Sequence, residues 1–319
     1  MPHHPRIESV DIASFVTTKS RNAELWFVNN PELEQYILGY AAKYTQTYGV
    51  QLYALAIEGN HKHLAAHFPR ANRSSFMRDL NSNVARAVAR HTPEYPGGTF
   101  WGRRYSGEFL PGPADIEEYF FYIVLQPVED GLVRRISEFP GYNCFHDAIH
   151  GIERVYKVVD WAGYNSRKRY DRSVCIRDYT TYIPLRFQRL PGYEHMSSSE
   201  YVKHMQNKLR VREDAIAAKR FADGKGFLGR KRLRRVKRGA IPKDPKISRP
   251  FNRRPRVLAV CPIRRHQYLS WYYARINAFR LASLQYRSGL IDAQFPDGMF
   301  RPHLGTAPPK PQELAVFFY

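Results

Sequence analysis

Residues 54–68 read Ala-Leu-Ala-Ile-Glu-Gly-Asn-His-Lys-His-Leu-Ala-Ala-His-Phe, an apolar stretch with a polar centre. This pattern predicts a strand, a hairpin turn at residues 58–60 and a second strand that begins with the histidines. Side chains two apart on a strand point to the same face, so His61 and His63 can hold one metal ion between them. A lone histidine is usually structural, but two on one strand face directly after a turn are a better ligand pair.

A second informative stretch is Tyr122-Ile-Val-Leu-Gln-Pro-Val-Glu-Asp-Gly-Leu-Val133. Residues four apart on a helix share a face, so the Tyr122 hydroxyl and the Gln126 amide can point at one place. Because Pro127 disfavours helix at the residue before it, this geometry requires the helix to continue into its last turn. Tyr119, one turn earlier, is a rival nucleophile. Two imidazoles, a carboxamide and a tyrosine predict a site that breaks a phosphodiester bond.

These segments resemble the motifs of a known family. Asn60-His61-Lys62-His63-Leu64 is similar to the Asn-His-x-His-Leu motif of single-tyrosine HUH transposases, in which the middle residue is usually apolar. Residues 122–133 resemble that family's Tyr-Ile-x-x-Asn-Pro-Val-x-Ala-Gly-Leu-Val segment. Three further matches follow the family's order: Phe15-Val-Thr-Thr18, Phe76-Met-Arg-Asp-Leu-Asn81 and Trp101-Gly-Arg-Arg-Tyr105. The likeness covers residues 8–145 and is nearest to the REP-associated tyrosine transposases.

The resemblance implies a metal-dependent DNA transposase, acting as both nickase and ligase. Tyr122 would be the nucleophile, and His61, His63 and Gln126 would hold Mg²⁺ or Mn²⁺; most relatives in this branch carry Asn at the position of Gln126. The implied substrate is single-stranded DNA with hairpin-bearing ends. The tyrosine would keep the 5′ phosphate and free a 3′ hydroxyl, which can rejoin a new end. Relatives include monomers and homodimers with exchanged tyrosine helices, so both assemblies stay open.

Lys62 departs from the family pattern. It should point to the opposite sheet face, under helices, where a lysine must reach solvent or pair with an acid. Lys62 also favours an alternative function, a catalytically inactive, domesticated nucleic-acid-binding protein with the same fold. A structural RNA-binding protein is a third alternative, favoured only by charge. His67 lies roughly 13 Å beyond His63 along the strand, so we interpret it as structural.

The order of predicted elements is β-α-β-β-α-β-α, which predicts an α+β fold with a ferredoxin-like antiparallel sheet and helices on one face. The predicted strands cover 9–18, 50–57, 61–68 and 99–110. The first helix should begin with Asn30 as its cap and Pro31 in its first turn, and it should end at Gly49. Later helices should begin near Asn72 or Ser74, at Pro113 or Asp115, near Ser199 and near 264. Ser197-Ser-Ser-Glu200 resembles a capping box at the start of the helix near Ser199.

Charge divides the 319-residue chain, whose formal net charge is +21. Residues 1–150 hold 14 Lys and Arg against 16 Asp and Glu, whereas residues 151–319 hold 36 against 13. This asymmetry predicts a catalytic domain over 1–150 and a basic, largely helical DNA-binding extension over 151–319, with a linker at about 239–263. The predicted DNA-binding residues are Arg103, Arg104, Arg230, Lys231, Arg232, Arg234, Arg235, Lys237 and Arg238.

Compartment signals are few. The three cysteines are Cys144, Cys175 and Cys261, whose wide spacing fits neither a zinc site nor a disulfide framework. The sequence has no apolar run of the roughly 18 residues that a membrane span requires, and no signal-like segment at its start. We therefore expect a cytoplasmic, nucleoid-associated protein that contacts no membrane.

Overall fold

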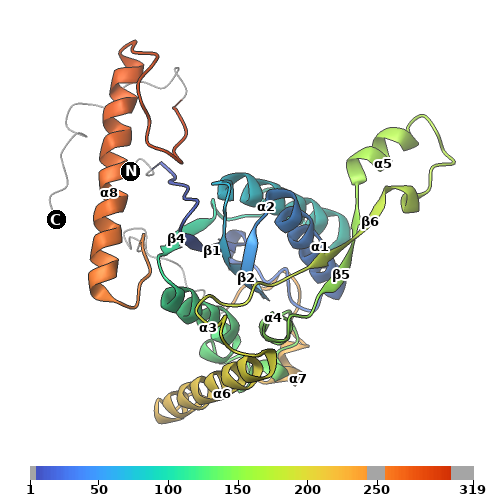
Figure 1. The fold of residues 1–319 in the computed structure, drawn as a ribbon. Helices are drawn as coiled ribbons and strands as arrows, with labels where there is room; N and C mark the ends of the chain where they lie inside the picture. Colours follow the sequence, from blue (N-terminus) through green and yellow to red (C-terminus); the bar gives the residue numbers. More distant parts are fainter. Residues whose placement is uncertain (1–4, 243–255, 303–319) are drawn as a thin grey trace.

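The structure is a computed structural model that describes residues 5–242 and 256–302. Its centre is a four-stranded antiparallel sheet with the strand order β2-β3-β1-β4 (Figure 1). The strands are β1 (Ala13–Lys19), β2 (Gln51–Glu58), β3 (His61–His67) and β4 (Ser106–Leu110). Two helices complete the unit, α1 (Pro31–Tyr48) between β1 and β2 and α2 (Arg73–His91) between β3 and β4. The predicted ferredoxin-like topology is confirmed, with the histidine strand at the centre of the sheet.

The ends of α1 form as the sequence predicts. The side chain of Asn30 accepts a hydrogen bond from the backbone N–H of Leu33 at 3.2 Å, and Pro31 occupies the first turn. Gly49 ends the helix at φ 64°, in the left-handed region that favours glycine. These local signals fix where α1 begins and ends before any tertiary contact is made.

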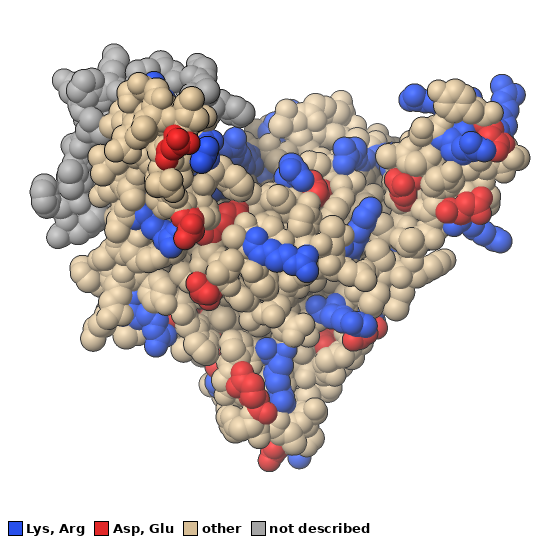
Figure 2. Space-filling view, turned by 45° about the horizontal axis from the view of Figure 1, so that its top comes forward, with Lys and Arg blue, Asp and Glu red and all other residues tan. Residues whose placement is uncertain are grey.

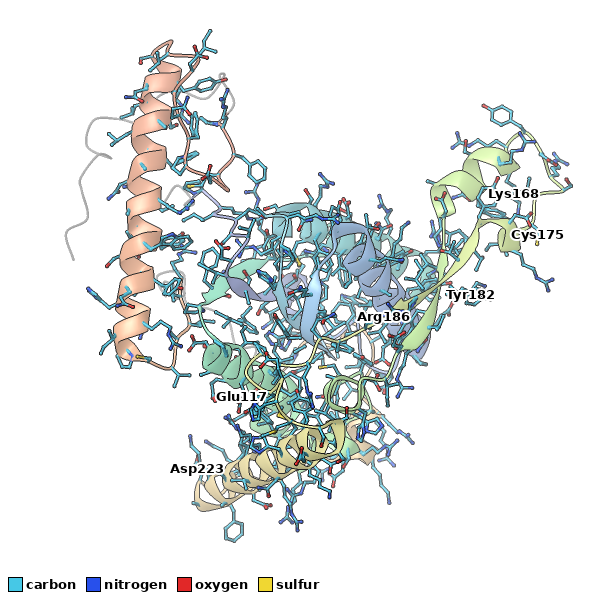
Figure 3. The ribbon with its side chains drawn as sticks, in the orientation of Figure 1. Glu117, Lys168, Cys175, Tyr182, Arg186 and Asp223 are labelled. Atoms are coloured by element: carbon cyan, nitrogen blue, oxygen red, sulfur yellow. The ribbon has the colours of Figure 1, made fainter. Side chains whose placement is uncertain are left out.

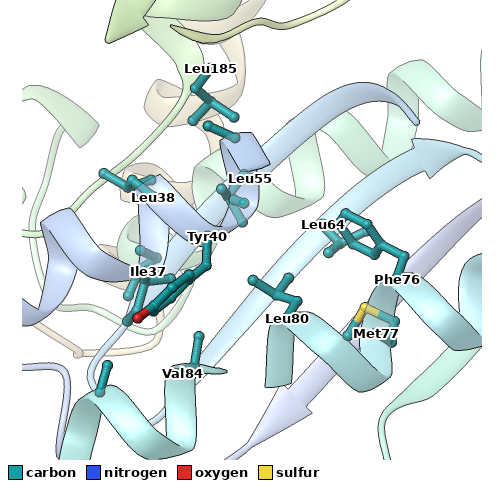
Figure 4. Close-up of a cluster of buried hydrophobic side chains, with 14 of the residues drawn as sticks. Ile37, Leu38, Tyr40, Leu55, Leu64, Phe76, Met77, Leu80, Val84 and Leu185 are labelled. Carbon is teal, nitrogen blue, oxygen red and sulfur yellow. The ribbon is translucent and has the colours of Figure 1, made fainter. Parts of the chain in front are cut away.

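Helices cover both faces of the sheet, so the prediction of helices on one face is wrong. α1 and α2 cover the face that carries Val16, Leu55 and Leu64. Figure 4 shows Leu55 and Leu64 of this face. The other face carries Ala54, Ala56 and Ala65, and the tyrosine helix α3 (Pro113–Glu129) packs against it. A strand presents alternate residues to its two faces, so these alanines share one face of the sheet. Their small side chains allow the helix to approach the strands closely.

α3 carries apolar residues around most of its circumference, because other helices cover the side that faces away from the sheet. Its outer neighbours are α4 (Phe145–His150) and α6 (Ser198–Ala222). Lys208 and Arg212 of α6 pair with Glu117 and Glu118 of α3 at 2.5 and 2.7 Å. The helix predicted near Ser199 is therefore present, and the Ser197 capping box at its start is confirmed. Packing from both sides holds the tyrosine helix in a fixed position.

The part of the chain after residue 150 is not only helical. β5 (Arg154–Val159) and β6 (Thr180–Leu185) form an antiparallel hairpin that the sequence did not reveal. The hairpin packs on α1 at Gly39, where an added Cβ would lie 3.1 Å from the Lys157 carbonyl oxygen. Beyond α1 it projects as an arm with α5 (Trp161–Lys168) at its tip (Figures 1 and 3).

The remaining elements include two helices of the extension. These are α7 (Arg230–Leu233) and α8 (Pro262–Arg287), together with short 3₁₀ turns at Arg21–Ala23, Ile136–Glu138 and Ile176–Tyr179. The sequence prediction of a final helix is confirmed by α8. Most of the predicted linker, residues 243–255, lies outside the described residues. Among the described helices, none combines the length and the apolar character that crossing a membrane requires.

Candidate metal and tyrosine site

The hairpin that carries the histidines has a two-residue turn. β2 continues through Glu58, so only Gly59 and Asn60 lie in the turn, and the sequence-based assignment of Glu58 to the turn is wrong. Glu58 therefore pairs directly with His61 across the hairpin. One ligand atom from each of Glu58, His61 and His63 lies within 4.8 Å of the others. This carboxylate is a candidate metal ligand that the sequence analysis missed.

Asn60 fixes the ring of His61. The Asn60 amide N–H₂ donates to the Ala23 carbonyl at 2.8 Å, which directs the amide oxygen towards the His61 Nδ1 at 2.7 Å. Because that oxygen can only accept, Nδ1 carries a proton, and in the neutral imidazole Nε2 then keeps the lone pair. His61 Nε2 lies 3.8 Å from the Glu58 carboxylate. An imidazole held in this tautomer is a prepared metal ligand.

His63 is held by the neighbouring strand β1. Its Nδ1 lies 2.8 Å from the Thr17 hydroxyl, directly across the strand pair. Phe15 stacks on the same ring, with centroids 5.3 Å apart and planes inclined by 17°. His63 is buried, while His61 is half-buried. The two rings contact each other edge to face at 4.6 Å, so one strand face brings both imidazoles together, as predicted.

Tyr122 lies beside these rings, on the last turns of α3. Its centroid is 6.0 Å from that of His63 and 5.6 Å from that of Phe15. Tyr122 is 43% exposed, although its neighbours on α3 are almost all buried. The helix continues to Glu129 with Pro127 inside it, so Gln126 remains one turn beyond the tyrosine.

The rival tyrosine is less suited to attack. Tyr119 also contacts the Tyr122 ring, at 5.5 Å. Burial raises the pKa of Tyr119 to about 12, with nearby acidic side chains adding to the shift. A phenol with a raised pKa is ionised even less often at neutral pH than an ordinary tyrosine. The raised pKa of Tyr119 and the exposure of Tyr122 therefore both count against Tyr119 as the nucleophile.

All four predicted site residues line one cavity of about 980 Å³. His61 and His63 come from β3, whereas Tyr122 and Gln126 come from α3. The charged residues of its lining are Lys19, Glu34, Glu58, Glu129, Asp130 and Arg234. Because four acidic and two basic side chains line it, this cavity suits a divalent cation better than it suits an anion that binds without a cation.

Lys62 was predicted to reach solvent or to pair with an acid, and it does neither. It is 1% exposed, so it does not reach solvent, and its ammonium donates to the Asn81 side-chain oxygen at 2.6 Å rather than to an acid. It also lies 5.2 Å from the centre of the Trp101 ring. Burial lowers its pKa from 10.5 to about 7. The lysine lies under α2, on the sheet face opposite the histidines, and is separated from their cavity by the sheet.

His67 has the structural role that was predicted. Its ring bonds to the Val10 carbonyl oxygen at 2.6 Å and to the Gln51 side chain at 3.0 Å. These contacts tie β3 to the edge strand and to the segment before β1. His67 does not line the cavity with the other histidines.

The predicted DNA-binding residues lie in two places. Arg103 and Arg104 line a separate hollow of about 1020 Å³, with Arg6, Arg78 and Trp101 in the same lining. The basic run at 230–238 lies along the rim of the metal and tyrosine cavity, and within that run only Arg234 belongs to the charged lining. Figure 2 shows further Lys and Arg side chains over the body and over the projecting arm.

Comparison with known proteins identifies the domain that carries this site. The family described as "Transposase IS200 like" matches residues 11–123, which include both histidines and Tyr122. Residues 11–123 are thus similar to the IS200-like transposase family. The match ends just before Gln126 and does not cover the arm, α6 or α8.

Two solved structures are similar to part of this chain. A structure of the REP-associated tyrosine transposase bound to a REP hairpin is 20% identical, covers 46% of this chain and 84% of its own, and has a TM-score of 0.39. A putative transposase from Deinococcus radiodurans R1 is 19% identical, covers 34% and 86%, and has a TM-score of 0.27. No curated protein matches the chain in sequence.

Proposed function

We propose that the protein is a metal-dependent single-tyrosine transposase that cleaves single-stranded DNA and rejoins it. The observation that carries the proposal is the position of Tyr122, an exposed tyrosine that lies 6.0 Å from the His63 ring in the cavity shared with His61 and Gln126. An exposed nucleophile and a cluster of metal-ligand side chains in one cavity are what phosphodiester cleavage requires.

His61 and His63 would hold Mg²⁺ or Mn²⁺, with Glu58 and Gln126 as candidates for further ligands. The donor set fits such an ion, because it combines imidazole nitrogen with carboxylate or amide oxygen, and Asn60 already fixes the His61 tautomer. When bound, the ion would withdraw charge from the scissile phosphate and stabilise the transition state.

The covalent step falls to Tyr122. Its phenolate oxygen would attack the phosphorus, the bond from phosphorus to the 3′ oxygen would break, and the leaving oxygen would take a proton to become a 3′ hydroxyl. The 5′ phosphate would remain on the tyrosine as a phosphotyrosine. Attack by a 3′ hydroxyl on that phosphotyrosine would reverse the step and join a strand. Single-stranded DNA fits because the nucleophile needs an exposed backbone, and cations with aromatic rings bind such strands.

DNA contacts would come from both parts of the chain. We assign a catalytic role to residues 1–150 and a DNA-binding role to the basic extension at 151–319. Arg103 and Arg104 share their hollow with Trp101, and cations interleaved with aromatic rings suit a nucleic-acid strand. The proposal includes DNA ends that carry hairpins and a location at the nucleoid. It allows both a monomer and a homodimer.

A catalytically inactive DNA-binding protein is less favoured than it is from sequence. Lys62 was the residue that supported it, and Lys62 lies on the far side of the sheet from the cavity. The cavity that His61, His63 and Tyr122 share supports the catalytic alternative instead.

Replacing Tyr122 tests the proposal directly. Tyr122→Phe removes one oxygen and keeps the ring packing, so folding and DNA binding should survive while the covalent adduct disappears. Single-stranded DNA labelled at its 3′ end is incubated with Mn²⁺ and separated on a denaturing gel, because the label stays with the 5′-phosphotyrosine fragment.

Tyr119→Phe is the matched control and should leave the adduct intact. The two hydroxyls lie about one helical turn, roughly 5.4 Å, apart along α3. An adduct that persists in Tyr122→Phe and disappears in Tyr119→Phe would move the nucleophile to Tyr119 and overturn the assignment.

A further inference from the structure

One wall of the cavity comes from the basic extension. We call residues 226–242 the strap, because they cross from the end of the tyrosine helix to the segment before α1. At one end, the backbone N–H groups of Leu228 and Gly229 donate to the carbonyls of Gly131 and Leu132, both at 2.9 Å. These carbonyls belong to the turn that directly follows α3, so the strap begins next to the nucleophile's own helix.

The other end of the strap is tied to the loop before α1. The backbone N–H of Gly239 donates to the Leu25 carbonyl at 3.1 Å, and the N–H of Leu25 donates to the Ala240 carbonyl at 2.9 Å. The Asn29 side chain donates to two strap carbonyls, those of Leu233 and Val236, at 3.1 and 2.8 Å. With anchors at both ends and in its middle, the strap is a fixed part of the fold.

Leu233 and Val236 are among the more buried apolar residues of the strap, whereas most of its cations are exposed. Leu233 is buried at 8% exposure, and it lines the cavity together with Leu228, Val236 and Arg234. Arg238 is used structurally, since its guanidinium pairs with Glu94 at 3.1 Å and donates to the Asn29 carbonyl at 2.8 Å. Arg234 is therefore the one cation of the 230–238 run that the lining of the cavity includes.

The net charge of the cavity lining makes the position of Arg234 significant. The cavity lining holds four acidic side chains against Lys19 and Arg234, so it is net negative before any ion enters. A divalent cation would bring the lining close to neutral, and each phosphate of a DNA strand adds about one negative charge. A strand that passes through the cavity carries at least one phosphate besides the scissile one. That second phosphate needs a cation, and Arg234 offers a guanidinium suited to phosphate oxygens.

We propose that Arg234 binds a backbone phosphate of the single strand next to the scissile one and so positions the strand against Tyr122. The inference rests on the proposed function for the identity of the ligand. It makes the extension part of the active-site cavity, instead of an electrostatic anchor that acts only from outside.

The test compares two arginines of the same run. Arg234→Gln and Arg235→Gln remove equal charge, but Arg235 is exposed and does not line the cavity. Both are made in the Tyr122→Phe protein, which cannot react, and binding of a short fluorescent oligothymidylate is measured with Mn²⁺ present. The loss of one charge-assisted hydrogen bond lowers an affinity about tenfold, so we expect Arg234→Gln to weaken binding of the oligothymidylate about tenfold. Arg235→Gln should weaken it only about two- to threefold.

Two further results bear on the proposal. Arg234→Lys should recover part of the lost affinity, since it restores the charge without the planar fork. Thermal unfolding of Arg234→Gln should match that of the parent, because the side chain is exposed. Equal losses in Arg234→Gln and Arg235→Gln would overturn the inference and leave only a general charge effect.

The binding assay separates this inference from the proposed reaction. If the wild-type protein forms no adduct while Arg234→Gln still binds much more weakly than Arg235→Gln, the proposed cleavage fails and the Arg234 contact stands. If the adduct forms through Tyr122 but the two arginine variants bind equally, the reaction stands and the Arg234 contact fails.

Discussion

At the scale of single residues, the metal site poses a choice between two third ligands. Gln126 shares the face of Tyr122 on α3, and Glu58 faces His61 across the hairpin turn. Glu58 is a buried carboxylate, 3% exposed, and a negative oxygen ligand favours a divalent cation more than a neutral amide does. Glu58 is therefore the stronger candidate on electrostatic grounds.

Variants at these positions test the metal site. His61→Ala or His63→Ala should abolish Mn²⁺-dependent cleavage while leaving DNA binding largely intact. Glu58→Gln removes one charge and should weaken Mn²⁺ binding by at least about tenfold, more than Gln126→Ala does. Calorimetric titration with Mn²⁺ measures the affinities. Full cleavage in EDTA would refute the metal role, and a larger loss in Gln126→Ala would return the third position to the amide.

A second residue, Lys62, is an ammonium group buried without an acidic partner among the described residues. Lys62→Met should raise the free energy of unfolding at pH 7 by on the order of 1 kcal/mol, because burying a charged group is costly and a flexible apolar chain can fill the same space. Chemical denaturation of both proteins measures the difference. Lys225→Met, at an exposed position, is the control and should change little.

The pH dependence of that difference has a definite sign. Below pH 7 the folded protein holds the ammonium charged, so the penalty is complete. Between pH 7 and 10.5 the folded state releases the proton while the unfolded state keeps it, and the wild type gains stability as pH rises. The advantage of Lys62→Met should therefore shrink from pH 6 to pH 9. An advantage that grows with pH would contradict a depressed Lys62 pKa.

At the scale of elements, the sequence predicted the helices and strands that are marked by residues within or next to them. α1 was found from Asn30, Pro31 and Gly49, and α6 from its Ser197 capping box, because caps and left-handed glycines act within one turn. The site face was found from the spacing of His61 and His63. Strand and helix periodicity thus sufficed for the core sheet and for most of the candidate site.

Elements that depend on distant partners were not found. The β5–β6 hairpin was missed because 20 residues separate its strands, whereas hairpin signals come from turns of two to five residues. Its buried side, with Tyr156 and Leu185, exists only through α1, more than 100 residues earlier. Glu58 was missed for a smaller reason, since a turn shorter by one residue moves it into the strand. The position of Arg234 follows from backbone pairing between the strap and two remote loops.

At the scale of the whole molecule, the charge asymmetry has a structural counterpart. Residues 1–150 are nearly neutral, and the later part of the chain, which carries the excess of cations, packs on them at several points. The hairpin contacts α1, α6 contacts α3, and the strap borders the cavity. Basic charge is thereby distributed around the nearly neutral part of the chain that holds the candidate metal and tyrosine site.

The cations that face outward on the strap should then bind DNA without regard to sequence. Neutralising Arg230, Lys231, Arg232, Arg235 and Lys237 together, with Arg234 and Arg238 retained, leaves the cavity lining and the Glu94 ion pair in place. We expect weaker binding to all single strands alike. The logarithmic salt slope should also flatten, by about 0.7 for each cation that contacts a phosphate. Affinities measured across a series of salt concentrations, for two unrelated sequences, decide the matter. An unchanged slope would mean that these cations contact no phosphate and that the extension binds DNA through the arm or α8 instead.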